Sequence, residues 1–251
     1  TSDHGDMNGD HYLWRKGYPW EASSRVNLVM KLPESLAFKT VKSATSNALV
    51  ELRDVAPTIY DVVGILEIVS KVDPLMNGKS LLPILNHSTT LVRNYLDLEH
   101  STVYNDNIHW NALVGQTNIE QQQETHPSID TATFIDTSNG YTHPHANCTL
   151  VKYIFFASTG REQLFCLSSD THESYDLASD PRYKSLVALW RAKMADHFRA
   201  EGRGDDWVTD DGDLVLRPEG RIYGAHYPCS TTTWKRGNTK DGTDHTSTVN
   251  R

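Results

Sequence analysis

Five side chains that can bind a cation stand within nine residues near the start of the chain. They are three aspartates and two histidines: Asp3, His4, Asp6, Asp10 and His11. Gly5 and Gly9, which stand among them, allow sharp backbone turns. Carboxylates with an imidazole suit a hard or borderline cation such as Ca²⁺, Mg²⁺ or Mn²⁺, whereas zinc prefers more nitrogen or sulfur. The cluster is a candidate metal site, although a solvated polar turn can have the same composition.

Helices and strands that follow must position this segment. The apolar run at 26–32 predicts a short buried strand. A helix is expected over 54–64, with Asp54 as its cap and Pro57 in its first turn. Its apolar residues recur every three or four positions, so one face should pack inward. That face carries Leu52, Val55, Ile59, Val62 and Val63.

A second group of elements occupies the rest of the chain. Strands are expected at 93–99, 109–114, 151–157 and 161–167, and they predict a small, mostly antiparallel sheet. A helix that begins at Asp180-Pro181 and stops at Gly202 should lie across this sheet. Residues 116–148 are polar and have no period, which predicts an insertion loop, and 230–251 predict a disordered tail. A boundary is expected near 86–92.

Charge and hydropathy exclude several classes of function. The 251 residues include 24 Lys and Arg against 32 Asp and Glu, so the net charge is −8 with His neutral. A general nucleic-acid or anionic-membrane binder needs a cationic face, so neither is expected. No apolar run approaches the roughly 18 residues of a membrane span.

Cysteine and asparagine positions bear on the compartment. Cys148, Cys166 and Cys229 are too few for a disulfide scaffold or a thiolate zinc site, but one bridge with one thiol left over is possible. Glycosylation sequons at Asn86 and Asn147 are compatible with a secreted or lumenal protein. Because the first residue is Thr and no signal-like region precedes the fold, we expect the true amino terminus to lie upstream.

Three motifs stand in order near the start of the chain: Ser2-Asp3-His4-Gly5-Asp6-Met7, Leu13-Trp14-Arg15-Lys16 and Glu21-Ala22-Ser23-Ser24-Arg25-Val26. In residue types and spacing they resemble the type I sulfatases, near the branch with choline sulfatase and the phosphonate monoester hydrolases. Residues 77–85 resemble the family's "G-x-S-L-x-P-L-L" close, and 163–178 resemble its carboxy-terminal "L-F-D-L-x-x-D-P" segment. The likeness covers about residues 1–200, apart from 116–148.

This resemblance implies an α/β, alkaline-phosphatase-like fold. Residues 1–90 would be the C-terminal part of the catalytic domain, with part of a mixed sheet and its flanking helices. Residues 91–229 would be a small antiparallel sheet-and-helix subdomain. The resemblance also makes Asp3 and His4 ligands of one divalent cation, usually Ca²⁺, and makes Lys16 a catalytic residue that binds a sulfate oxygen. A charged lysine can neutralise the ester and stabilise charge on the leaving oxygen.

Two further positions are candidates from the residues themselves. His100 ends a predicted strand and precedes a polar, aromatic stretch, so it is either a structural histidine or a substrate contact. Glu21 and Arg25 are four residues apart and could pair across one helical turn, which would shape the site.

The family's nucleophile has no counterpart in this sequence. Formylglycine is made from a Cys or Ser in a C/S-x-P/A-x-R motif, and no such motif is present. We therefore expect the carboxy-terminal half of a longer, metal-dependent sulfuric ester hydrolase that acts on a sulfate ester, and an inactive isolated fragment. The alternatives are a phosphodiesterase or phosphonate monoester hydrolase of the same fold, and a non-catalytic remnant that binds sulfated glycans.

Overall fold

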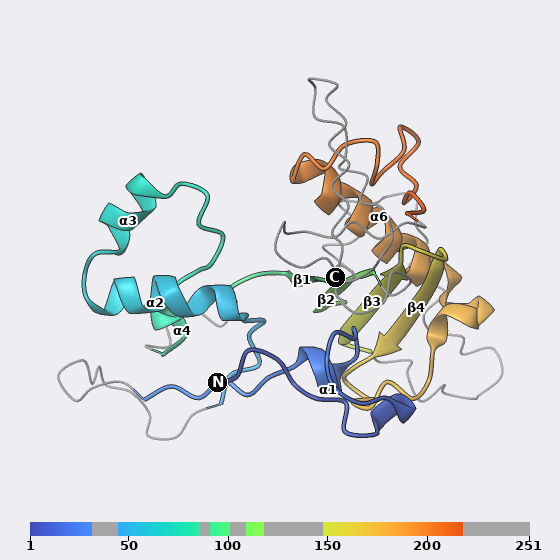
Figure 1. The fold of residues 1–251 in the computed structure, drawn as a ribbon, viewed down its shortest axis with the longest axis horizontal. Coiled ribbons are helices and arrows are strands. Elements are labelled where there is room, and N and C mark those ends of the chain that lie inside the picture. Colours follow the sequence, from blue (N-terminus) through green and yellow to red (C-terminus); the bar gives the residue numbers. More distant parts are fainter. Residues whose placement is uncertain (32–44, 86–90, 101–108, 118–147, 218–251) are drawn as a thin grey trace, which may run out of the picture.

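A four-stranded antiparallel sheet forms the centre of the computed structural model, which describes residues 1–31, 45–85, 91–100, 109–117 and 148–217 (Figure 1). The strands lie in sequence order and are β1 (Tyr95–His100), β2 (Trp110–Gln116), β3 (Leu150–Phe156) and β4 (Arg161–Cys166). Tyr153 stands opposite Leu113 on one side and Leu164 on the other. The predicted small antiparallel sheet is therefore confirmed.

Helix α6 (Lys184–Ala200) packs across one face of this sheet, as predicted (Figure 1). Two short 3₁₀ turns, η5 (Leu177–Ser179) and η6 (Pro181–Tyr183), lead into it. Trp190 is fully buried and lies so close to β2 that a Cβ at Gly115 would be 2.5 Å from its ring. Only glycine fits there, because the helix and the sheet approach so closely.

A disulfide joins Cys148, just before β3, to Cys166 at the end of β4. One bridge was an open possibility in the sequence, and this is the pair that forms it. The bond closes the β3–β4 hairpin at the end opposite its turn.

The other face of the sheet is covered by the N-terminal part of the chain. Trp110, Ile154 and Phe165 point to this side and pack with Leu49 and Trp20. The short helix α1 (Glu21–Ser24) lies here as well, beneath the sheet in Figure 1. Two covered faces explain why the central strands are buried along nearly their whole length.

A group of helices stands apart from the sheet in Figure 1. It consists of η3 (Leu52–Asp54), α2 (Val55–Val62), α3 (Leu66–Val72) and α4 (Leu82–Leu85). Pro57 lies in the first turn of α2, as predicted. Asp54 stands at the N-cap position of α2, as predicted, but its carboxylate makes no capping hydrogen bond to this helix. It accepts the backbone N–H groups of Glu51 at 2.9 Å and Lys79 at 2.8 Å, and it pairs with Arg93 at 2.5 Å.

Two predictions about burial are wrong. Residues 26–31 form no strand, and Val29 is 84% exposed, because none of the described strands pairs with them. The apolar face of α2 is not inward either: Ile59 and Val63 are 55% and 60% exposed, while Pro57 and Thr58 are buried. Apolar spacing identifies a face, but burial also requires a partner that covers it.

The remaining predictions concern segments on which the structure bears little. Largely or wholly outside the described residues lie the insertion at 116–148, the tail at 230–251 and both sequons. The domain division near residue 90 stays a prediction.

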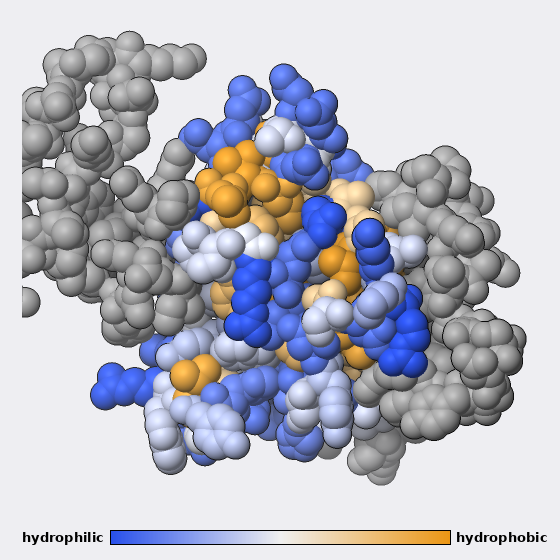
Figure 2. Space-filling model, turned by 90° about the vertical axis from the view of Figure 1, so that its right-hand side faces the viewer, coloured by the Kyte–Doolittle hydropathy of each residue, from blue (hydrophilic) through white to orange (hydrophobic). Residues whose placement is uncertain are grey.

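Among the described helices, none has the length and apolar content to cross a bilayer. The surface seen in Figure 2 is mostly polar, with small apolar areas between the polar side chains.

Candidate active site

The N-terminal cluster lies in a compact loop that is closed by its own backbone. The N–H of Met7 donates to the carbonyl of Arg15 at 2.8 Å, and that of Gly9 donates to Leu13 at 2.8 Å. The side chain of Met7 is buried and anchors the loop. This hairpin-like path brings residue 16 back beside residue 4.

Helix α1 fixes both ends of the loop. The N–H of Gly5 donates to the carbonyl of Ser23 at 2.9 Å, and a Cβ at Gly5 would lie 2.0 Å from the carbonyl oxygen of Ala22. The buried Ser23 hydroxyl accepts the N–H groups of Gly17 at 3.1 Å and Tyr18 at 3.2 Å. Glycine is therefore required at position 5, since α1 approaches the backbone there directly.

Three of the predicted site residues meet at the open end of this loop. His4 Nδ1 lies 2.7 Å from the carbonyl of Gly5, so Nδ1 carries the proton and Nε2 is an acceptor. His4 Nε2 lies 2.8 Å from Lys16 Nζ and 3.3 Å from Asp3 Oδ2. Asp3 and Lys16 are exposed, so the group faces solvent in this chain.

The donor set at this position fits a divalent cation in part. A neutral imidazole nitrogen and a carboxylate oxygen supply two donors, which leaves most of a calcium ion's six to eight positions to other groups. The Lys16 ammonium now donates to the lone pair of His4 Nε2, so it would have to move aside for a cation to bind there. No third His, Cys, Asp or Glu joins Asp3 and His4 in a ligand-like group within the described ranges.

His100 lies against the same loop. A Cβ at Gly17 would be 2.9 Å from His100 Nε2, so this ring contacts the residue next to Lys16. The ring stacks on Trp110, with centroids 6.0 Å apart, and Trp110 Nε1 donates to the carbonyl of Gly17 at 2.9 Å. The loop and strand β1 thus place His100 near Lys16, and its contact with substrate stays a prediction.

Beneath the loop lies a buried charge cluster that the sequence analysis did not identify. Lys152 on β3 is fully buried, and its ammonium lies 2.7 Å from Glu21 Oε1 and 2.9 Å from Glu173 Oε1. Burial raises the pKa of Glu173, and the positive charge of Lys152 opposes this rise. Glu21 also approaches Arg25 at 3.5 Å, as predicted, but Lys152 is its nearer partner. In the sequence, the signal for this buried cluster was a lysine within the apolar run 150–156.

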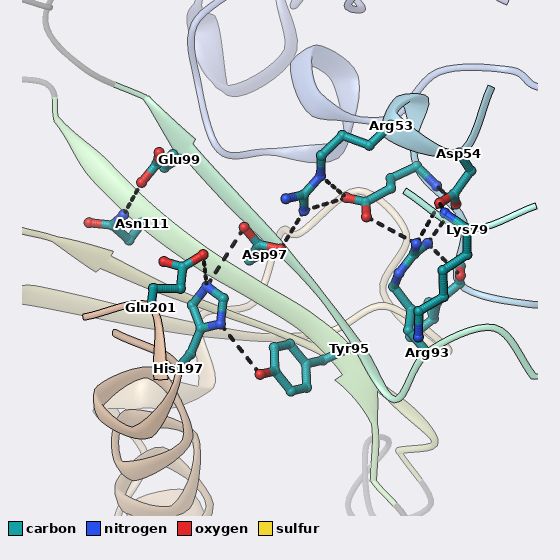
Figure 3. A network of polar contacts seen from close by, with 12 residues as sticks. Arg53, Asp54, Lys79, Arg93, Tyr95, Asp97, Glu99, Asn111, His197 and Glu201 are labelled. Carbon is teal, nitrogen blue, oxygen red and sulfur yellow. Dashed lines mark hydrogen bonds and ion pairs between the residues drawn. The ribbon is translucent and has the colours of Figure 1, made fainter. Parts of the chain in front are cut away.

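A second polar group was also missed by the sequence analysis. Asp97 of β1 faces His197 and Glu201, which lie four residues apart at the end of α6 (Figure 3). Burial tends to raise the pKa of Asp97, but the neighbouring His197 and Arg53 outweigh it and hold this pKa below its usual range. The i, i+4 spacing of His197 and Glu201 was visible in the sequence, whereas their meeting with Asp97 depends on the tertiary fold.

Known proteins with similar sequence include several sulfatases. No protein-family model matches the chain. An arylsulfatase from Clostridium perfringens is 28% identical over 231 residues, which is 92% of this chain and 37% of that protein. The multifunctional alkaline phosphatase superfamily protein PehA from Trinickia caryophylli is 29% identical over 220 residues, or 81% of this chain and 36% of that protein.

A solved structure has a similar fold. It holds a protein in complex with its substrate, D-glucosamine-2-N,6-O-disulfate, and matches 81% of this chain and 34% of its own length with a TM-score of 0.56 and 17% identity. The resemblance to the type I sulfatase family and the alkaline-phosphatase-like fold class are therefore confirmed. The chain spans a little over a third of the length of the relatives it matches.

Proposed function

We propose that this chain supplies the cation-binding and anion-binding part of the active site of a sulfuric ester hydrolase. The observation that supports the proposal is the convergence of Asp3, His4 and Lys16 at one end of a rigid loop. In this proposal Asp3 Oδ2 and His4 Nε2 hold one divalent cation, with Ca²⁺ preferred and Mg²⁺ or Mn²⁺ as substitutes. When bound, the cation would polarise the S–O bonds of the ester.

Lys16 has the second role in the proposed reaction. Its ammonium would donate to a sulfate oxygen and neutralise the charge of the ester. It would also stabilise negative charge on the leaving oxygen as the S–O bond breaks, and this interaction grows toward the transition state. His100, which contacts Gly17, would approach the substrate from strand β1.

The nucleophile is proposed to come from a part of the enzyme outside these 251 residues. The C/S-x-P/A-x-R motif is absent, and each relative is far longer than this chain. The isolated chain should therefore bind the anion but should not turn it over. Measurable hydrolysis of an aryl sulfate by the isolated chain would refute this point.

Binding of inorganic sulfate tests the proposed role of Lys16. In a calorimetric titration with excess CaCl₂, Lys16→Ala should weaken sulfate binding by about 10-fold or more, because a charge-assisted hydrogen bond contributes about 1.5–3 kcal/mol. Lys71→Ala is the matched control, since Lys71 is an exposed lysine that pairs with Glu67 on α3. Equal affinity of the two variants would exclude Lys16 as the anion-binding group.

Phosphate or phosphonate ester hydrolysis is a second candidate, favoured by the likeness to PehA. Lysine and a dication serve any tetrahedral anion, so the loop alone does not distinguish the two. The titration should therefore be repeated with inorganic phosphate and phenylphosphonate. Tighter binding of either than of sulfate would favour this candidate, whereas anion binding without turnover by the full-length enzyme would favour a non-catalytic sulfated-glycan-binding protein.

A further inference from the structure

A cavity of about 970 Å³ lies between strand β1, the end of helix α6 and the segments around Arg53 and Arg93. Three side chains on its wall can serve as metal ligands, and their ligand atoms all lie within 4.8 Å of one another: Asp97, His197 and Glu201. Figure 3 shows the imidazole of His197 between the two carboxylates. This group is separate from the loop that carries Asp3, His4 and Lys16.

The two distances from His197 Nε2 to the carboxylates are close to those between ligand atoms of a metal site. His197 Nε2 lies 3.7 Å from Asp97 Oδ2 and 3.4 Å from Glu201 Oε1. In a tetrahedral site with bonds of about 2.1 Å, neighbouring ligand atoms lie about 3.4 Å apart. His197 Nε2 is buried and makes no well-formed hydrogen bond to any described residue. The three ligand atoms therefore lie close enough together to share one ion after small shifts of the side chains.

Other side chains hold each of the three ligands in place. Arg53 binds Asp97 Oδ1 at 2.5 Å, and Arg203 binds Glu201 Oε2 at 2.5 Å, so each carboxylate has one oxygen held and the other turned to His197. The hydroxyl of Tyr95 lies 3.4 Å from His197 Nδ1, on the far side of the ring. Partners of this kind orient metal ligands and select the histidine tautomer.

A network of ion pairs holds the side chains around the cavity in place. Five carboxylates and three guanidinium groups share six ion pairs here. They are Glu51, Asp54, Asp97, Glu99 and Glu201 with Arg53, Arg93 and Arg203. On the cavity wall itself three carboxylates, those of Glu51, Asp97 and Glu201, stand among the guanidinium groups of Arg53, Arg93 and Arg203 and the ammonium of Lys79.

We propose that Asp97, His197 and Glu201 form a second metal site, which binds one divalent transition-metal ion. A single imidazole with two carboxylates suits Mn²⁺, and Zn²⁺, which prefers more nitrogen or sulfur, also accepts this donor set with water in the remaining positions. The ion would join β1 to the end of α6, so its role is to fix these elements beside the cavity.

Zinc binding to the whole chain tests this site. The first candidate site is removed with Asp3→Asn and His4→Gln, and Zn²⁺ is then titrated by calorimetry at pH 7.5, with the Co²⁺ absorption spectrum as a second readout. One equivalent should bind. Glu201→Gln, a change in a partly exposed side chain, should weaken binding by about 10-fold or more. Tyr95→Phe should weaken it by about 10–100-fold through loss of ligand orientation.

Asp196→Asn is the matched control, because Asp196 is an exposed carboxylate one residue before His197. This variant should keep full affinity for Zn²⁺. Two results would overturn the proposal: no zinc binding by the chain that lacks the first site, or equal affinity with and without the Glu201 carboxylate. Either result would leave His197 as a side chain that contacts two carboxylates without a metal ion.

Discussion

Lys152 connects the candidate active site to the core of the molecule. Its ammonium is buried between Glu21, at the start of α1, and Glu173, and it also donates to the carbonyl of Pro19 at 2.9 Å. The loop with Asp3 and His4 rests on α1, so this one side chain holds the site against β3. A buried charge of this kind destabilises strongly when its partner is removed.

Replacement of Lys152 by methionine should therefore destabilise the protein by about 3–5 kcal/mol, because it leaves two carboxylates buried without their cation. The measurement is urea unfolding followed by circular dichroism. Lys71→Met is the control, and this loss of an exposed pair should change stability by less than about 0.5 kcal/mol. Similar effects of the two changes would show that Lys152 has no special structural role.

Gly5→Ala should disturb the loop more than any other single methyl group placed there. The new Cβ would lie 2.0 Å from the carbonyl oxygen of Ala22, so the loop must move away from α1. We expect a loss of about 2 kcal/mol or more in unfolding free energy and weaker sulfate binding. Gly204→Ala, which meets no atom within 4 Å but has a φ of +76°, is the control for backbone strain alone.

At the scale of single residues, the sequence motifs identify candidate site residues, but they do not predict which other side chains surround them. Asp3, His4 and Lys16 could be selected because their spacing is local and resembles a family. The contact between Lys152 and Glu173 could not be predicted, because Glu173 lies 21 residues further along the chain and only the fold brings it to Lys152. The contact between Asp97 and His197 could not be predicted either, because 100 residues separate them and only the fold brings them together.

For helices and strands, the periodicity of apolar residues predicts whether an element forms better than it predicts whether its apolar face is buried. All four strands and α6 lie close to the positions predicted from the alternation and helical spacing of apolar residues. The prediction succeeds there because α6 and the sheet bury each other's apolar faces. The helix over 55–62 also forms, but its apolar face stays exposed. The run at 26–31 lacks a neighbouring strand among the described segments, so its apolar content does not produce a strand.

Asp54 makes the helical group sensitive to acid. Burial alone would raise the pKa of Asp54, but hydrogen bonds from Arg93 and from the backbone of Lys79 and Glu51 outweigh it and lower this pKa. The contribution of Asp54 to stability is therefore present above the unfolded-state pKa of about 3.9 and is lost as pH falls through the lower folded-state pKa.

The stability difference between wild type and Asp54→Asn should accordingly be largest near pH 7 and should shrink below about pH 4. Unfolding free energies measured from pH 7 to pH 2 give this difference directly. A difference that is constant over this range would mean that the ionised carboxylate is not what stabilises the helices.

Reduction of the disulfide should weaken the β3–β4 hairpin. Cys148 and Cys166 are 18 residues apart, and closure of a loop of that size contributes about 3 kcal/mol in the chain-entropy description. Urea unfolding with and without dithiothreitol should show this loss. The double variant Cys148→Ala, Cys166→Ala should be equally unstable in both conditions, and continued sensitivity to the reductant would point to another thiol.

For the molecule as a whole, the sheet needs both of its covers. Helix α6 covers one face, and the N-terminal segment with Trp20 and Leu49 covers the other. The fold class could be predicted from the order of strands and helices together with the family resemblance. Which segment covers the second face could not, because residues 1–31 show no regular pattern that pairs with a strand.

Because the segment that would hold the anion is also one cover of the sheet, ligand occupancy and unfolding are thermodynamically linked. A compound present at 100 times its Kd should stabilise the chain by about 2.7 kcal/mol, even where no chemistry follows. Thermal-shift screening of sulfated sugars, aryl sulfates and phosphonates can therefore rank substrate classes on this chain alone.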